Sequence, residues 1–174
     1  MPYKLCISNL TFFGNENQLY NILNLFNYNY IELAPIKNSD WDKFYNNDLF
    51  KIKEKINTFN IKVESLQAIN YKITYNLFNE IENEKLLLHL KKVIDVSIKN
   101  KIKVLVFGSP KNRFIINKNL NNQETFINFF KKMGDYIGDN NLKICIENNS
   151  KLYNCNFLNT INEVSQIVKK INHK

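Results

Sequence analysis

The sequence predicts an α/β fold built on a parallel sheet, and three observations lead to this prediction. Short β-rich runs alternate with longer helical patterns about five times along the 174 residues, which is the pattern of βα units. The run at 104–107 is apolar throughout, as in parallel strands that are buried on both faces. No Pro-, Gly- or Ser-rich linker interrupts the chain, so residues 1–174 are expected to form a single domain.

The first half of the chain supplies three strands and two helices. A strand at 4–8 is followed by a helix at 18–26, and a second strand at 30–34 ends at Pro35. A helix at 49–59 and a third strand at 61–69 come next. The first helix follows from apolar side chains that fall on one face at helical spacing, namely Leu19, Ile22, Leu23 and Phe26.

The second half supplies the longest helix, at 82–100, in which Leu86, Leu90 and Val93 recur at helical spacing. A strand at 102–107, a helix at 123–137 and a strand at 142–146 follow. The last helix, at 160–171, begins with Thr160 and has Glu163 three residues later, which predicts a capping box.

Charge and cysteine content narrow the function classes. The net charge is +8, but the lysines are spread along polar helix faces, so a solvated surface is expected and nucleic acid is an unlikely partner. Cys6, Cys145 and Cys155 show no CxxC spacing, which disfavours a disulfide framework or a zinc ribbon. Cys6 and Cys145 lie in apolar runs and are expected in the core. No secretory signal and no membrane-spanning run is recognised, so a cytoplasmic location is expected.

Candidate reactive groups are sought at the carboxyl ends of the strands, where parallel βα proteins place them. Glu147 directly follows the fifth strand and is the sharpest candidate. A carboxylate there binds a divalent metal or moves a proton beside a carbonyl, although a loop glutamate that caps a turn is the simpler alternative. Glu32 alternates with apolar neighbours and faces the opposite side of its strand, either for substrate contact or for a structural hydrogen bond.

Further candidate site residues lie at or near the ends of the other predicted strands. Gln67 lies in the third strand, and Lys111, Asn112 and Arg113 follow the fourth strand, where they could hold an anionic or polyhydroxyl ligand or simply form a solvated loop. Trp41, the only tryptophan, could stack on a sugar or cover the core from a polar loop. His89 and His173 are expected to have structural roles. No His or Cys cluster follows a predicted strand, so a bound metal is expected to be Mg or Mn and not zinc.

Periodicity alone leaves an open doubly wound sheet and a barrel as alternatives. No GxGxxG or GxxxxGK[ST] motif follows the first strand, so the nucleotide-binding interpretation loses its main support. The segments 31–35, 65–68, 106–113 (Val-Phe-Gly-Ser-Pro-Lys-Asn-Arg) and 145–160 resemble the second to fifth strand segments of sugar phosphate isomerases/epimerases, a branch of the xylose-isomerase-like TIM barrel superfamily. The resemblance runs through essentially the whole chain, but its motifs say little about the substrate.

The resemblance implies a (β/α) TIM-barrel-like fold that is incomplete, with about five βα units. It implies that Glu147 is a metal ligand and that Gln67 and 111–113 contact the sugar. The other ligands of the family come from strands six to eight, which these residues do not include. Complete enzymes of the family remove a proton beside the sugar carbonyl while a metal polarises the oxygens.

Three functions stay open from the sequence. The first is a sugar isomerase or epimerase that is a fragment or is completed by strands of another chain. The second is a non-catalytic truncated barrel that self-associates and binds a sugar or a protein partner. Open sheet edges make a homo-oligomer or a complementing chain the expected partner in both cases. The third, an abasic-site endonuclease-like protein, is least favoured because segments 67–70 and 108–110 offer no histidine.

Overall fold

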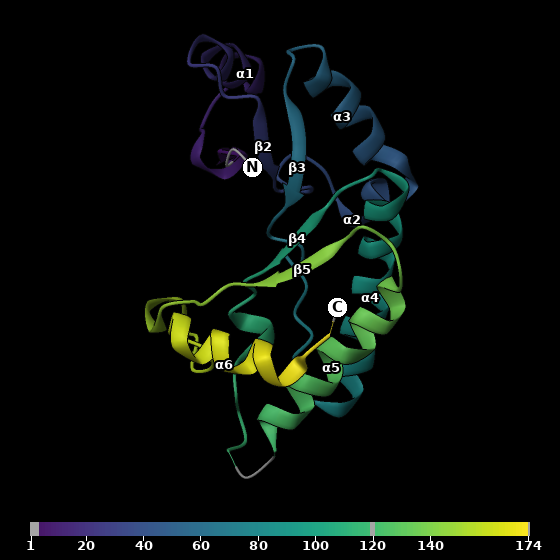
Figure 1. Cartoon of the computed structure of the whole chain (residues 1–174), viewed down its shortest axis with the longest axis vertical. Helices are drawn as coiled ribbons and strands as arrows, with labels where there is room; N and C mark the ends of the chain where they lie inside the picture. Colours follow the sequence, from purple (N-terminus) through teal and green to yellow (C-terminus); the bar gives the residue numbers. More distant parts are fainter. Residues whose placement is uncertain (1–3, 119–120, 174) are drawn as a thin grey trace.

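The computed structural model describes residues 4–118 and 121–173. Its strands are all parallel and stand in chain order: β1 (Cys6–Ser8), β2 (Tyr30–Leu33), β3 (Lys62–Leu66), β4 (Val104–Phe107) and β5 (Lys143–Ile146). A doubly wound sheet reverses its strand order at a switch point, whereas a barrel adds each strand beside the previous one. The observed order resolves the open alternative in favour of the barrel-like arrangement. Figure 1 shows the curvature, since β4 and β5 run at a steep angle to β2 and β3.

Each predicted helix is present, with boundaries shifted by a few residues. The long helices are α1 (Glu16–Leu25), α3 (Leu49–Asn57), α4 (Glu80–Lys99), α5 (Asn122–Ile137) and α6 (Ile161–Ile171). The structure also has short helical elements that the sequence does not predict, namely η1 (Asn9–Thr11), α2 (Trp41–Lys43), η2 (Phe44–Asp48), η3 (Lys111–Arg113) and η4 (Lys151–Tyr153). The predicted loop around Trp41 is therefore wrong in detail, because Asp40 caps a short helix there through the N–H of Lys43 (2.8 Å).

The capping box at the start of α6 is confirmed. The N–H of Glu163 donates to Oγ1 of Thr160 (3.2 Å), and the N–H of Thr160 donates to Oε2 of Glu163 (2.9 Å). These two bonds satisfy backbone donors that the first turn of a helix leaves without partners. They fix the point at which the chain leaves the loop after β5.

The core lies between the sheet and its helices. Ile31, Leu33, Leu105 and Phe107 alternate along β2 and β4 and are almost fully buried against the helical layer. Phe107 packs edge-on against Phe130 of α5, with ring centroids 5.1 Å apart. Such a pair adds about 0.5–1.5 kcal/mol beyond area burial, so it helps to hold β4 against α5. In Figure 1, α5 lies beside α4 on the same side of these strands.

The other face of the sheet is concave and only partly covered. Successive side chains of a strand point to opposite faces, so Glu32, Val106 and Cys145 face away from the helices. The prediction that Cys6 and Cys145 are core residues is wrong, since both are exposed. Their apolar neighbours in sequence are the side chains that reach the helices. Among the described residues, no helix is both long and apolar enough to cross a membrane.

Candidate functional site

Glu147 stands at the carboxyl end of β5, as predicted. Its backbone N–H donates to the carbonyl of Phe107 (3.1 Å), which keeps the strand end beside β4. Its exposed carboxylate lies over Gly108: a Cβ at that position would be 2.4 Å from Oε2 of Glu147 and 3.5 Å from Oδ1 of Asn149. The absence of a side chain at Gly108 is what gives the carboxylate this place at the rim of the sheet.

Arg113 does not face the open rim. It is completely buried, and its Nη2 donates to Oδ1 of Asn149 (3.0 Å) and to the carbonyl of Leu158 (3.5 Å). Within the described residues, Nε and Nη1 of Arg113 have no hydrogen-bond partner. The guanidinium thus ties the loop after β4 to the loop after β5, immediately beneath the segment that carries Glu147.

Asn112 and Lys111 behave differently although they are neighbours. Asn112 is buried, and its Nδ2 donates to the carbonyls of Ile73 (2.8 Å) and Tyr75 (2.9 Å), so both amide hydrogens hold the loop between β3 and α4. Lys111 is exposed on the one-turn helix η3. Of the three residues, Lys111 is the one whose side chain reaches solvent at the rim.

Glu32 and Gln67 lie on the concave face. The register between β2 and β3 shifts after Ile31, which places Glu32 opposite Ser65 instead of Glu64. The hydroxyl of Ser65 donates to Oε2 of Glu32 (2.7 Å), and Nε2 of Gln67 donates to Oγ of Ser8. A band of polar side chains therefore crosses the concave face from β1 to β3. The predicted orientation of Glu32, away from its apolar neighbours, is confirmed.

Trp41 packs within an aromatic cluster at the edge of the rim. Its Nε1 donates to the carbonyl of Tyr71 (2.8 Å), and its ring meets the edge of His89 at 4.6 Å between centroids. His89 is buried, with Nε2 at 2.8 Å from the carbonyl of Ile69 and Nδ1 at 2.5 Å from the hydroxyl of Tyr45. A carbonyl only accepts, so Nε2 carries the proton and Nδ1 accepts from Tyr45. Burial lowers the pKa of His89.

Two further residues of the rim are not indicated as site residues by the sequence. Asn9 is buried, and its Oδ1 accepts from the N–H of Ala34 (2.8 Å), which ties the ends of β1 and β2 together. Nζ of Lys37 donates to the carbonyls of Asn9 (2.6 Å) and Phe12 (2.7 Å). Nothing in the local sequence indicates these bonds, because each joins segments about 25 residues apart.

A small hollow opens where these segments meet. Its volume is about 160 Å³, and most of its wall is apolar. The lining residues come from the ends of the first three βα units, namely Leu10, Ala34, Ile36, Lys37, Ala68 and Tyr71.

A divalent metal fits this donor set poorly. In the described part of the chain, no group of three His, Cys, Asp or Glu side chains lies close enough to hold a metal ion. Mg²⁺ and Mn²⁺ are bound by several oxygen or nitrogen ligands, whereas the rim beside β5 offers the single carboxylate of Glu147. These residues alone do not form a metal centre.

The comparisons with known proteins agree with the topology. Neither a family model nor a curated protein matches the sequence. Solved structures do match: D-psicose 3-epimerase in the presence of D-fructose has a TM-score of 0.72 at 14% identity over 99% of this chain. D-allulose 3-epimerase from Methylomonas sp., in complex with D-allulose, has a TM-score of 0.69 at 17% identity, also over 99% of this chain.

A third match is a xylose isomerase-like TIM barrel protein from Mycobacterium smegmatis in complex with magnesium, with a TM-score of 0.62 at 9% identity over 99% of this chain. The chain spans 60%, 61% and 62% of the allulose epimerase, the psicose epimerase and the mycobacterial protein, respectively. Identities this low establish the fold and nothing finer. The chain has the fold of the xylose isomerase-like TIM barrels, over five successive βα units of an incomplete barrel.

Proposed function

We propose that the chain is the β1-to-α6 part of a sugar or sugar phosphate isomerase or epimerase, in which Glu147 moves a proton at a carbon beside the sugar carbonyl. The observation that carries the proposal is the Glu147 carboxylate at the carboxyl end of β5, held over Gly108 in a fold shared with two sugar epimerases. A carboxylate at a strand end of such a sheet is placed to act as a general base.

The remaining candidates take distinct parts in this proposal. Glu32, Gln67 and Lys111 offer a carboxylate, an amide and an ammonium to sugar hydroxyls or a phosphate from the concave face and the rim. Arg113 and Asn112 hold the loop beneath, and Trp41 closes the edge of the rim over His89. A bound Mn²⁺ or Mg²⁺ would polarise the sugar oxygens, but among the described residues Glu147 belongs to no group of three side chains that could hold such an ion.

Proton transfer is tested directly in D2O. The chain is incubated with D-fructose or D-psicose and Mn²⁺, and loss of the sugar C–H signal beside the carbonyl is followed by NMR. We expect deuterium uptake in the unmodified chain and none in Glu147→Gln, while Glu124→Gln, an exposed change on α5, serves as the control. Saturation-transfer NMR on the same samples reports sugar binding without turnover.

The single carboxylate also favours a second candidate, a non-catalytic sugar-binding protein. Sugar binding without deuterium uptake would select that candidate, and absence of both would overturn the sugar-related proposal. We further propose self-association, because exposed Leu25 and Phe26 at the end of α1, and exposed Ile161 and Val168 on α6, leave apolar surface on these two helices. Light scattering after gel filtration measures it, and a monomer at all concentrations would refute it.

A further inference from the structure

The amino-terminal rim of the sheet, opposite the candidate sugar site, gathers lysines that are far apart in the sequence. Lys4 precedes β1, Lys62 begins β3, Lys103 precedes β4 and Lys143 begins β5. Parallel strands begin at the same edge, so the topology brings these side chains together. Lys101 joins them from the connection between α4 and β4. Five lysines that are far apart in the sequence therefore lie along one rim of the folded sheet.

Carboxylates do not balance this rim. Glu64 of β3 pairs with Nζ of Lys4 (2.8 Å) and of Lys103 (3.5 Å). Although partial burial opposes it, these two ammonium groups lower the pKa of Glu64. Asp139 is the one acidic residue in the described connections 26–29, 58–61, 100–103 and 138–142. The five lysines at this rim thus exceed its two carboxylates.

A neighbouring lysine adds to the positive field. Lys53 of α3 donates from Nζ to the carbonyl of Asn100, at the end of α4. Burial, and next the charge of Lys101, lower the pKa of Lys53, although the charge of the neighbouring Glu54 opposes them. Cationic groups at this rim are close enough to act on one another, so an anionic partner would relieve their repulsion.

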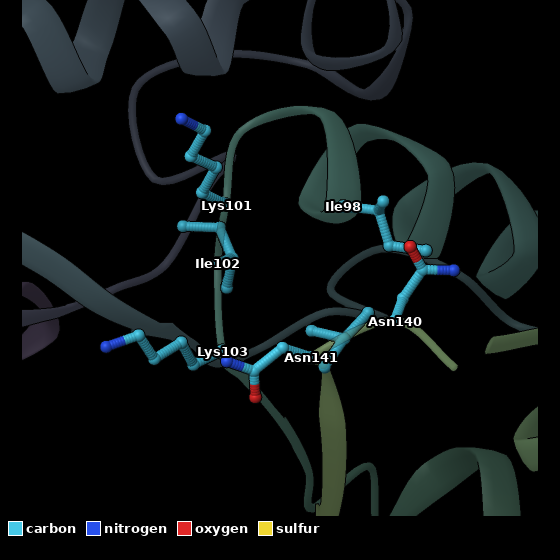
Figure 2. A pocket seen from close by; sticks show the side chains of 7 residues that line it. Ile98, Lys101, Ile102, Lys103, Asn140 and Asn141 are labelled. Atoms are coloured by element: carbon cyan, nitrogen blue, oxygen red, sulfur yellow. The ribbon is translucent and has the colours of Figure 1, made fainter. Parts of the chain in front are cut away.

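An open hollow of about 330 Å³ lies within this rim, between the carboxyl ends of α4 and α5 (Figure 2). The aliphatic part of its lining is Ile98, Ile102 and Leu142, and Lys101, Lys103, Asn140 and Asn141 complete it. In Figure 2 the ammonium groups of Lys101 and Lys103 extend to the same side of the hollow, and Asn140 lies on the opposite side. The hollow offers an apolar floor with cations along one wall.

We propose that this rim is a docking surface for an acidic polypeptide segment that carries a bulky apolar residue. The apolar side chain would enter the hollow over Ile98 and Ile102, and flanking carboxylates would meet Lys101, Lys103 and Lys143. The partner is expected to be negatively charged, because the rim carries more lysines than its carboxylates neutralise. The apolar floor distinguishes a peptide side chain from a bare phosphate backbone, which needs cations alone.

The surface is independent of the proposed sugar chemistry. The candidate sugar site lies at the carboxyl ends of the strands, and this rim lies at their amino ends. The residues that line the hollow come from the end of α4, from the connection between α4 and β4 and from the connection between α5 and β5, which are all within the described chain. A failure of the sugar proposal therefore leaves this proposal standing, and the reverse also holds.

The test uses the full chain and fluorescence anisotropy of a short labelled peptide in which a Leu-Phe pair stands between runs of Glu. The comparison probes are the same peptide with the Leu-Phe pair replaced by serines, and a single-stranded DNA of the same length. The variant is Lys101→Asn/Lys143→Gln. Its matched control is Lys72→Asn/Lys151→Gln at the opposite rim, since Lys72 and Lys101 share a left-handed backbone (φ 64° and 57°) that asparagine tolerates.

We expect the Leu-Phe peptide to bind and the serine peptide to bind at least about fivefold more weakly. The rim variant should bind the Leu-Phe peptide about fivefold more weakly than the unmodified chain does, because it loses two exposed charge contacts. The control variant should bind as the unmodified chain does. Equal binding of the serine peptide, tighter binding of the DNA, an equal loss in the control, or no peptide binding would each overturn the proposal. Circular dichroism verifies the variants, and the peptide comparison on the unmodified chain decides the matter even if a variant misfolds.

Discussion

Replacement of Gly108 by alanine tests the geometry of the Glu147 carboxylate. The added Cβ would lie 2.4 Å from Oε2 of Glu147, and ordinary contact begins at 3.4 Å, so the carboxylate must move by 1.0 Å. The atom that yields is the end of a flexible, exposed side chain, so the move costs at most an unfavourable rotamer, about 0.5–1.5 kcal/mol. Gly108 lies outside the left-handed region, so the backbone accepts the substitution.

Stability and chemistry should therefore respond differently. For a chain of this size we expect Gly108→Ala to lower Tm by about 2–4 °C per kcal/mol lost. If Glu147 moves the proton, a displacement of about 1 Å should slow deuterium uptake by on the order of a hundredfold. Urea unfolding followed by fluorescence of Trp41 gives the free energy of unfolding, and NMR in D2O gives the exchange rate.

A double-mutant cycle identifies the atom that clashes. In the Glu147→Ala background the carboxylate is gone, so Gly108→Ala should change the free energy of unfolding by less than about 0.5 kcal/mol. An equal loss in both backgrounds would refute the reasoning, because the clash would then involve other atoms. A loss above about 3 kcal/mol in the unmodified background would also refute it, since a flexible side chain cannot account for that cost.

Three further outcomes follow from the structure. Burial lowers the pKa of His89, so the unfolded chain binds a proton at this residue at a higher pH than the folded chain does. The free energy of unfolding should therefore fall as the pH drops below 6.5. Urea titrations at several pH values measure this fall, which should be absent in His89→Asn. Thr160→Ala removes the side-chain bond of the α6 capping box and should cost about 1 kcal/mol by urea unfolding, with Lys111→Ala, an exposed change, as the unaffected reference. Asn112→Ala leaves two backbone carbonyls of the β3–α4 loop without their donor and should cost about 2–3 kcal/mol in the same assay, whereas a loss below that of Thr160→Ala would contradict its assigned role.

The sequence carried the order and type of the secondary structure because those depend on local patterns. Apolar spacing within α4 and alternation along β2 are properties of neighbouring residues, and both placed the elements within a few positions. The capping box of Thr160 and Glu163 spans a single turn and was predicted to the residue. The position of Glu147 at a strand end followed from the same local reasoning.

Tertiary structure decided which face of each helix or strand is buried against a neighbouring element. Cys145 lies in an apolar run, yet it is exposed, because only the alternate side chains of β5 reach the helices. The sequence predicts a ligand contact for Arg113 as for Lys111, yet Arg113 is buried and its guanidinium donates to Asn149, a residue 36 positions later. The gathering of Lys4, Lys103 and Lys143 at one rim likewise arises only when parallel strands align their amino ends. A sequence specifies local periodicity directly, whereas burial and charge clustering depend on contacts between segments that only the folded sheet brings together.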